Sequence, residues 1–130
     1  MQAQVSLTPP PLTKLCQPVP ELPVRDVQQA QRHYCEKLGF EACWQFPEGG
    51  GPDIEIGSVK RGELSIFLRR RVTAFEPAVH WMYAEDIQAT YEEMRSRGTN
   101  IVDPLEKKPW GITQFTVADL DGNLFYVHGD

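Results

Sequence analysis

The sequence predicts an α+β protein in which two β-α-β-β-β modules form curled, mixed sheets around a cleft. The first observation is a repeat: two tripeptides recur sixty residues later, Asp26-Val27-Gln28 as Asp86-Ile87-Gln88 and Gly62-Glu63-Leu64 as Gly122-Asn123-Leu124. Such self-similarity indicates two copies of one structural unit. The second observation is that each copy holds one helical pattern and four strand patterns. Because one helix covers only one sheet face, the other face is expected to form a cleft or to meet another chain.

The first module is predicted over residues 16–72. Its first strand, within 17–24, alternates so that Val19 and Glu21 share a face. A helix follows, capped by Asp26, ended by Gly39 and carrying His33 at its surface. The apolar stripe of this helix, at helical spacing, consists of Val27, Ala30, Tyr34 and Leu38. Strands are expected over 40–46, 54–59 and 63–68, the last two as a hairpin.

The second module is predicted over residues 77–130 and repeats this plan. A strand over 79–84 precedes a helix that is capped by Asp86 and ended by Gly98. The buried stripe of this helix is expected to be Ile87, Tyr91 and Met94. Three strands complete the module, one beginning at 100–103 and the others spanning 112–118 and 124–128.

Size and composition favour a single domain over 16–130, preceded by an extended, Pro-rich arm at 1–15. The chain has 130 residues, and a half of about sixty residues would be poorly stable alone. An apolar fraction of 41% and no run of about 18 apolar residues exclude a membrane span. The arm lacks the pattern of a secretory signal, and three cysteines without CxxC spacing indicate neither disulfides nor a zinc knuckle. A cytoplasmic location is therefore expected.

Charge narrows the expected partners. A net charge of −5 disfavours binding to nucleic acid, because the phosphates must be neutralised by a basic face of the protein. The same charge favours association with a cationic ligand. The one basic cluster is Arg69-Arg70-Arg71. It is interpreted either as a solvated strand end or as an anion contact.

Several motifs, in order, resemble the vicinal oxygen chelate superfamily, which includes glyoxalase I, extradiol dioxygenases and bleomycin resistance proteins. They are the stretch 19–27, Tyr34, Leu38-Gly39-Phe40, Arg61-Gly62-Glu63-Leu64, Trp110-Gly111 and Asp119-Leu120-Asp121-Gly122-Asn123. The later motifs are most similar to those of the bleomycin resistance proteins. The resemblance runs from about residue 17 to the C-terminus and implies the paired-module fold. It is less specific for activity, because one scaffold hosts unrelated sites.

The resemblance also implies where a metal would bind. Metal-using members take ligands from the first and last strands of each module, which here correspond to Val19, Val79, Ile66 (or its neighbour Phe67) and Tyr126. Valine and isoleucine cannot coordinate a metal, whereas catalytic sites need about three His or carboxylate donors. No metal and no other cofactor are therefore expected.

Displaced ligands offer an alternative. His80 lies one residue from Val79, but strand alternation places it on the opposite face. His128 shares the face of Tyr126, as either a ligand contact or a solvated side chain. A set of Glu21, His80 and His128 would make the protein a metal-dependent lyase, isomerase or dioxygenase.

The residues projected onto the cleft are largely aromatic, which suits stacking against flat ligands and attraction of cations. The predicted ligand-binding residues are Glu21, Trp44, Phe46, Phe67, Trp81, Tyr83, Trp110, Tyr126 and His128. The rings could alternatively fill the core. Glu21 is expected either to pair with a ligand ammonium or guanidinium group or to lie exposed at a strand edge.

These observations predict a binding protein. The expected function is metal-free sequestration of a bulky, cationic and aromatic small molecule, similar to antibiotic resistance by bleomycin resistance proteins. A homodimer with two clefts between modules is expected. A metal-dependent enzyme and a non-catalytic regulatory or interaction domain are the alternatives.

Overall fold

The computed structural model describes residues 12–130, which form two modules of β-α-β-β-β order. The first contains β1 (Glu21–Val24), α1 (Val27–Leu38), β2 (Glu41–Phe46), β3 (Ile56–Arg61) and β4 (Leu64–Arg70). The second contains β5 (Val79–Tyr83), α2 (Ile87–Arg97), β6 (Asn100–Lys107), β7 (Thr113–Ala118) and β8 (Leu124–Gly129). The sheet orders are β1-β4-β3-β2 and β5-β8-β7-β6, and in each sheet only the first pair is parallel. The predicted fold class of paired mixed sheets is confirmed.

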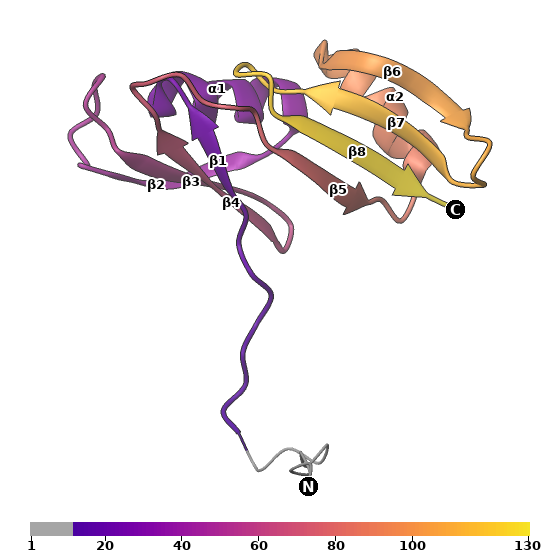
Figure 1. The fold of residues 1–130 in the computed structure, drawn as a ribbon, viewed down its shortest axis with the longest axis horizontal. Helices are drawn as coiled ribbons and strands as arrows, with labels where there is room; N and C mark the ends of the chain where they lie inside the picture. The colour runs from indigo at the N-terminus through magenta and orange to yellow at the C-terminus, as the bar shows by residue number, and fades with distance from the viewer. Residues whose placement is uncertain (1–11) are drawn as a thin grey trace, which may run out of the picture.

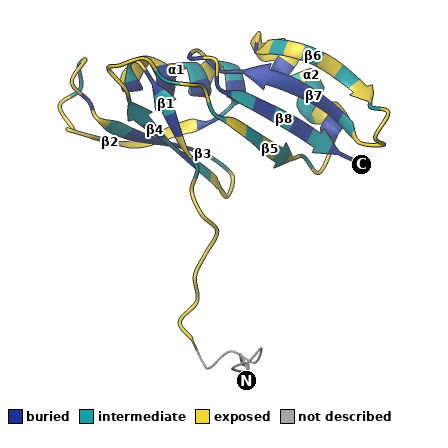
Figure 2. Ribbon diagram, viewed as in Figure 1, coloured by how far each residue is buried: buried dark blue, intermediate teal, exposed yellow. Residues whose placement is uncertain are grey.

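One face of each sheet is covered by helix. α1 packs against β2, β3 and β4, α2 packs against β6 and β8, and the two helices contact each other. Figure 1 shows both helices behind the sheets. The core lies between these layers, and its largest fully buried side chains include Tyr34, Phe115 and Phe125. Figure 2 shows buried positions concentrated along β7 and β8 and on α1. The opposite sheet faces remain open.

Both helices begin and end as the sequence predicts. The Asp26 Oδ1 atom accepts a hydrogen bond from the Gln29 amide at 2.8 Å, and Asp86 accepts from the Ala89 amide at 3.0 Å. Gly39 and Gly98 end the helices in the left-handed conformation, at φ of 74° and 76°. The stripe predicted for α1 is fully buried; in α2, Ile87 and Met94 are buried and Tyr91 is partly buried.

The sixty-residue repeat shortens by one residue within the helices. α1 has 12 residues and α2 has 11, so their C-terminal glycines are fifty-nine residues apart. In the parallel pairs, Glu21 lies opposite Phe67, and Trp81 lies opposite Tyr126. Tyr126 is therefore equivalent to Phe67. Of the two residues considered for the last-strand position of the first module, Ile66 is therefore wrong and Phe67 holds that position, because Ile66 is fully buried.

A buried carboxylate joins the two modules. Asp119 accepts hydrogen bonds from the Tyr34 hydroxyl at 2.6 Å and from the amides of Asp121 and Asn123 at 2.9 Å each. The Asn123 Nδ2 atom donates to Asp119 and to the Pro23 carbonyl, both at 2.9 Å. Burial and the adjacent Asp119 carboxylate raise the pKa of Tyr34 well above its usual value. The β7–β8 turn is thereby fixed to the first module.

The predicted arm lies mostly outside the described part of the chain, which begins at residue 12. Residues 12–20 form neither helix nor strand; the Pro20 carbonyl accepts a hydrogen bond from the Phe67 amide of β4, and the beginning of this segment extends away from the sheets (Figure 1). Leu12 and Leu15 are 74% and 92% exposed. The boundary between arm and domain stays a prediction.

Two further sequence predictions concern membrane-spanning segments and disulfide bonds. Within residues 12–130, none of the helices is long and apolar enough to cross a membrane. Cys16, Cys35 and Cys43 are free thiols, with Cys16 and Cys43 exposed.

His33 is not the surface residue that the helical pattern predicts. Its side chain is half-buried, and its Nε2 atom is buried without a hydrogen-bond partner. Burial lowers the pKa of His33, an effect reinforced by Lys37 and opposed by the carboxylates of Asp119, Asp121 and Glu36. The folded protein therefore resists protonation at this site more than the unfolded chain does.

This difference predicts a pH-dependent stability. When the pH falls from 7.5 to 5.5, the unfolded chain gains a proton at His33 near its ordinary pKa of 6.5, whereas the folded chain does so only at lower pH. The free energy of unfolding should therefore decrease more in the natural protein than in His33→Phe. Urea denaturation at both pH values measures this decrease for the natural protein and for His33→Phe. Equal decreases in the two proteins would contradict the lowered pKa of His33.

Candidate ligand-binding site

One row of residues crosses the open face of the first sheet. The strand register places Trp44 opposite Ser58, Ser58 opposite Phe67, and Phe67 opposite Glu21. The Trp44 and Phe67 rings meet edge to face with centroids 5.2 Å apart. Phe46, two residues along β2, is 59% exposed. The predicted residues of this sheet do lie together on one accessible face.

Glu21 lies at the edge of this row, but its carboxylate is already paired. The Oε1 atom accepts a hydrogen bond from Arg69 Nε at 2.9 Å, and Oε2 lies 3.8 Å from Arg71 Nη2. Two guanidinium groups beside one carboxylate leave no excess negative charge there. Glu21 is therefore not the free carboxylate that a cationic ligand needs, although its place on the open face is as predicted.

The open face of the second sheet carries an aromatic cluster formed by Trp81, Tyr83, Tyr126 and His128. Trp81 lies opposite Tyr126, and Tyr83 lies opposite His128. The Trp81 ring centroid is 4.8 Å from that of Tyr126 and 5.7 Å from that of His128, while Tyr83 and His128 are 5.5 Å apart. Trp81 and Tyr83 are 53% and 57% exposed. This cluster offers a broad, rigid surface for stacking.

Carboxylates lie around the aromatic cluster. The Tyr83 hydroxyl donates to Asp130 Oδ2 at 3.0 Å, and this hydrogen bond raises the pKa of Tyr83. Asp130 is thus held against the rim of the cluster. Alternation along the last strand contained a signal for this placement, since residues 126, 128 and 130 follow one another at the strand period.

Two more carboxylates come from β6, two strands from β8. Asp103 is in register with Thr116, and Glu106 with Gln114. The Lys108 amine lies 2.6 Å from Asp103 Oδ2 and also contacts Glu106, and its hydrogen bond to Asp103 raises its pKa. Irregular pairing along β6 hides this arrangement from sequence periodicity. We call Asp103, Glu106 and Asp130 the acidic rim.

Trp110 is connected to the same sheet through a buried amide. It lies in the turn between β6 and β7, where its Nε1 atom donates to Gln114 Oε1 at 3.0 Å. Gln114 is 3% exposed and lies opposite His128. The indole itself is 62% exposed. Trp110 therefore has a defined anchor with its ring left accessible.

The residues at the implied metal positions do not fit a metal. Val19 and Val79 are partly exposed hydrocarbons, while Phe67 and Tyr126 occupy the equivalent places on β4 and β8. Within residues 12–130, no three His, Cys, Asp or Glu side chains are grouped in a way that could hold a metal ion. No reaction step through a metal is derived from this site.

The proposed displaced ligands do not meet either. The His80 ring stacks against buried Phe125 with centroids 6.5 Å apart, on the covered face of the second sheet. His128 lies on the open face of that sheet, and Glu21 belongs to the other sheet. The set of Glu21, His80 and His128 is therefore wrong as a metal site.

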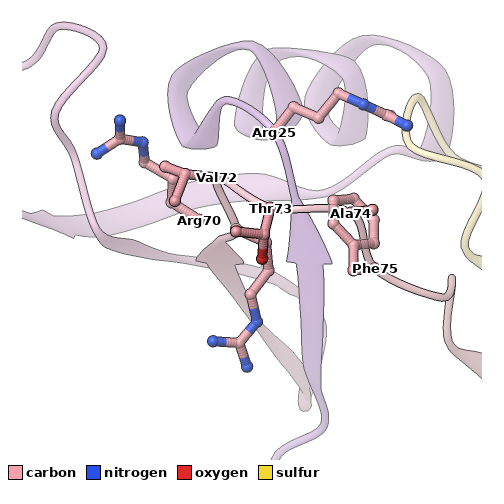
Figure 3. A pocket seen from close by; sticks show the side chains of 7 residues that line it. Arg25, Arg70, Val72, Thr73, Ala74 and Phe75 are labelled. Atoms are coloured by element: carbon pink, nitrogen blue, oxygen red, sulfur yellow. The ribbon is translucent and has the colours of Figure 1, made fainter.

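The basic cluster divides between two environments. Arg69 and Arg71 pair with Glu21, while Arg70 and Arg71 also border a cavity of about 410 Å³ beside Arg25 and the segment 72–75. Figure 3 shows the Arg25 and Arg70 side chains pointing in different directions around this cavity. Arg25 is engaged with Asp121 at 3.1 Å. The guanidinium groups do not converge on one point.

Comparisons with known proteins agree with this architecture. Residues 17–127 match the model of the Glyoxalase/Bleomycin resistance protein/Dioxygenase superfamily. The chain belongs to this superfamily. It is also similar to the uncharacterized protein YetH of Bacillus subtilis (strain 168), with 30% identity over 108 residues, covering 80% of this chain and 89% of YetH.

Several solved structures share the fold of this chain. TioX from Micromonospora sp. ML1 superposes with a TM-score of 0.73 at 24% identity, covering 85% of this chain and 95% of TioX. The Streptomyces verticillus bleomycin-binding protein complexed with copper(II)-bleomycin has a TM-score of 0.72 at 23% identity, covering 92% and 99%. The bleomycin resistance determinant encoded on the transposon Tn5 has a TM-score of 0.74 at 21% identity, covering 89% and 98%.

Proposed function

We propose that the protein binds and sequesters a bulky, flat, cationic small molecule, without a metal and without changing it chemically. The observation that carries this proposal is the aromatic cluster beside the acidic rim. The rings supply stacking area, and three carboxylates with one neighbouring amine, that of Lys108, supply negative charge. The structural neighbours described as bleomycin-binding support a binding role for this chain.

The proposed ligand site is completed by a second copy of the chain. In a single chain the aromatic rings lie on open faces rather than inside an enclosed cavity, with Trp44, Trp81 and Trp110 each at least 46% exposed. Drug-sized ligands usually need most of their surface buried. A homodimer in the cytoplasm, in which the first sheet of one copy faces the second sheet of the other, encloses two such sites.

Tryptophan fluorescence tests the proposal directly. Titration with bleomycin and with cationic polycyclic dyes is expected to change the emission saturably, with one ligand bound per chain. Neutral analogues of the same dyes should bind more weakly, since they lack the attraction to the acidic rim. Sedimentation velocity should give a dimer. The proposal would be overturned by a monomer whose emission no compound changes. It would also be overturned by stoichiometric divalent metal retained through dialysis.

A further inference from the structure

We propose that a cavity at the seam between the two modules is a second binding site, for a compact, neutral, apolar ring of about the size of toluene. The cavity lies between the β3–β4 hairpin and the face formed by β5 and α2, and it has a volume of about 200 Å³. We call it the seam cavity. Its apolar wall is formed by Phe40, Leu64, Met82, Met94 and Val127. Of the aromatic cluster, only Tyr83 borders the seam cavity.

The repeat explains why a cavity occurs here. The equivalent seam, where the β7–β8 turn meets β1 and α1, is filled by the Tyr34 side chain and its contact with Asp119. Sixty residues after Tyr34, the matching position of α2 is Met94, which carries no ring. The seam cavity occupies the place where the first seam has a phenol.

Turn length reinforces this difference. Five residues, 119–123, connect β7 to β8 and hydrogen-bond into the first seam, whereas only residues 62–63 connect β3 to β4. The Asn123 amide reaches the Pro23 carbonyl at 2.9 Å, whereas Glu63, which the repeat aligns with Asn123, borders a different hollow beside residues 16–19. Fewer residues of the β3–β4 turn are therefore available to fill the second seam.

An ion pair joins the β3–β4 hairpin to α2 beside the seam cavity. Arg61, at the end of β3, binds Glu93 of α2 through two hydrogen bonds of 3.0 and 2.7 Å. Arg61 also donates to the Leu38 carbonyl at 2.8 Å. Because this guanidinium is already bonded three times, it offers little to an anionic ligand. The hairpin is fixed on α2 without closing the space beside it.

The chemistry of the wall selects an apolar occupant. Phe40, Met94 and Val127 are at most 6% exposed, and Met82 is partly buried. Methionine side chains are flexible and polarizable, so they adapt to an inserted ring. Engineered apolar cavities of about 150 Å³ bind benzene. Thr90 and Tyr83 add hydroxyl groups and no charge, and the Arg61 guanidinium that also borders the cavity is paired with Glu93.

Methionine methyl NMR with toluene as the probe tests this site. In protein labelled with ¹³C at the methionine methyl groups, the Met82 and Met94 signals, assigned with Met82→Leu and Met94→Leu, are expected to shift saturably. The expected dissociation constant is on the order of 1 mM, which suits a ligand of seven heavy atoms. Thr90→Leu places extra volume at the rim and should weaken binding at least tenfold. Leu120→Ala, which truncates an exposed side chain in the β7–β8 turn, should leave it unchanged.

Two results would overturn the site. They are linear, non-saturating shifts of the Met94 signal up to the solubility limit of toluene, and unchanged binding in folded Thr90→Leu. Because tryptophan emission reports the cluster and methionine signals report the seam cavity, either site can fail while the other stands.

Discussion

Asp119→Ala is expected to lower the free energy of unfolding by about 3–4 kcal/mol. The carboxylate is 5% exposed and accepts four hydrogen bonds, one of them from Tyr34 of the other module. Removing it leaves the donors of Tyr34, Asp121 and Asn123 buried without a partner, and each such donor costs about 1–3 kcal/mol. The loss is partly relieved by movement of the β7–β8 turn, which keeps the total below the simple sum.

Matched variants separate this effect from a general loss of charge. Tyr34→Phe keeps the ring in the core and removes one of the four bonds, so a smaller loss of about 1–2 kcal/mol is expected. Asp53→Ala removes an exposed carboxylate and should change stability by less than about 0.5 kcal/mol. Urea denaturation with two-state analysis gives the three values. If Asp119→Ala were as mild as Asp53→Ala, the buried link between modules would not contribute as described.

Trp81→Ala is expected to weaken binding of the cationic aromatic probe by about 10- to 100-fold. Its ring is the centre of the aromatic cluster, in contact with both Tyr126 and His128, so truncation removes stacking area and loosens the neighbouring rings. Because the substitution also removes a tryptophan, affinity should be measured by isothermal titration calorimetry. Leu120→Ala removes an exposed side chain in the β7–β8 turn and serves as the control.

A pair of charge variants locates the ligand cation. Asp130→Asn and Glu21→Gln each remove one negative charge, but Asp130 contacts Tyr83 whereas Glu21 is paired with Arg69 and Arg71. Asp130→Asn should weaken binding of the cationic probe and leave its neutral analogue unaffected. Equal affinity of Trp81→Ala and the natural protein would remove the aromatic cluster from the proposed site. A larger effect of Glu21→Gln than of Asp130→Asn would move the cation to the first sheet.

Most of the fold was predictable because its signals are local. The caps Asp26 and Asp86, the terminal glycines Gly39 and Gly98 and the strand alternation specify each element through its own backbone and its neighbours. The site was only partly predictable. Ile66 was placed wrongly because α2 is one residue shorter than α1. A fixed spacing of sixty residues therefore aligns the later strands one residue out of register, and a shift of one residue moves a side chain to the opposite face of the sheet.

The charge of the site could not be predicted, because it depends on contacts across strands. Arg69 lies in β4 and Arg71 directly follows it, and the parallel pairing of β1 with β4 brings both to Glu21, which is more than forty residues earlier in the chain. Asp103 and Glu106 lie on a strand with irregular register, where periodicity does not assign a face.

By itself, then, the sequence determined two modules, their elements, their superfamily resemblance and the hydrocarbon side chains at the implied metal positions. Those properties follow from residue identity and short-range geometry. Only the tertiary structure decided which rings touch, where Glu21 is neutralised, and which seam between modules is filled by Tyr34 and which holds a cavity. These depend on distances between residues far apart in the chain, which packing alone sets.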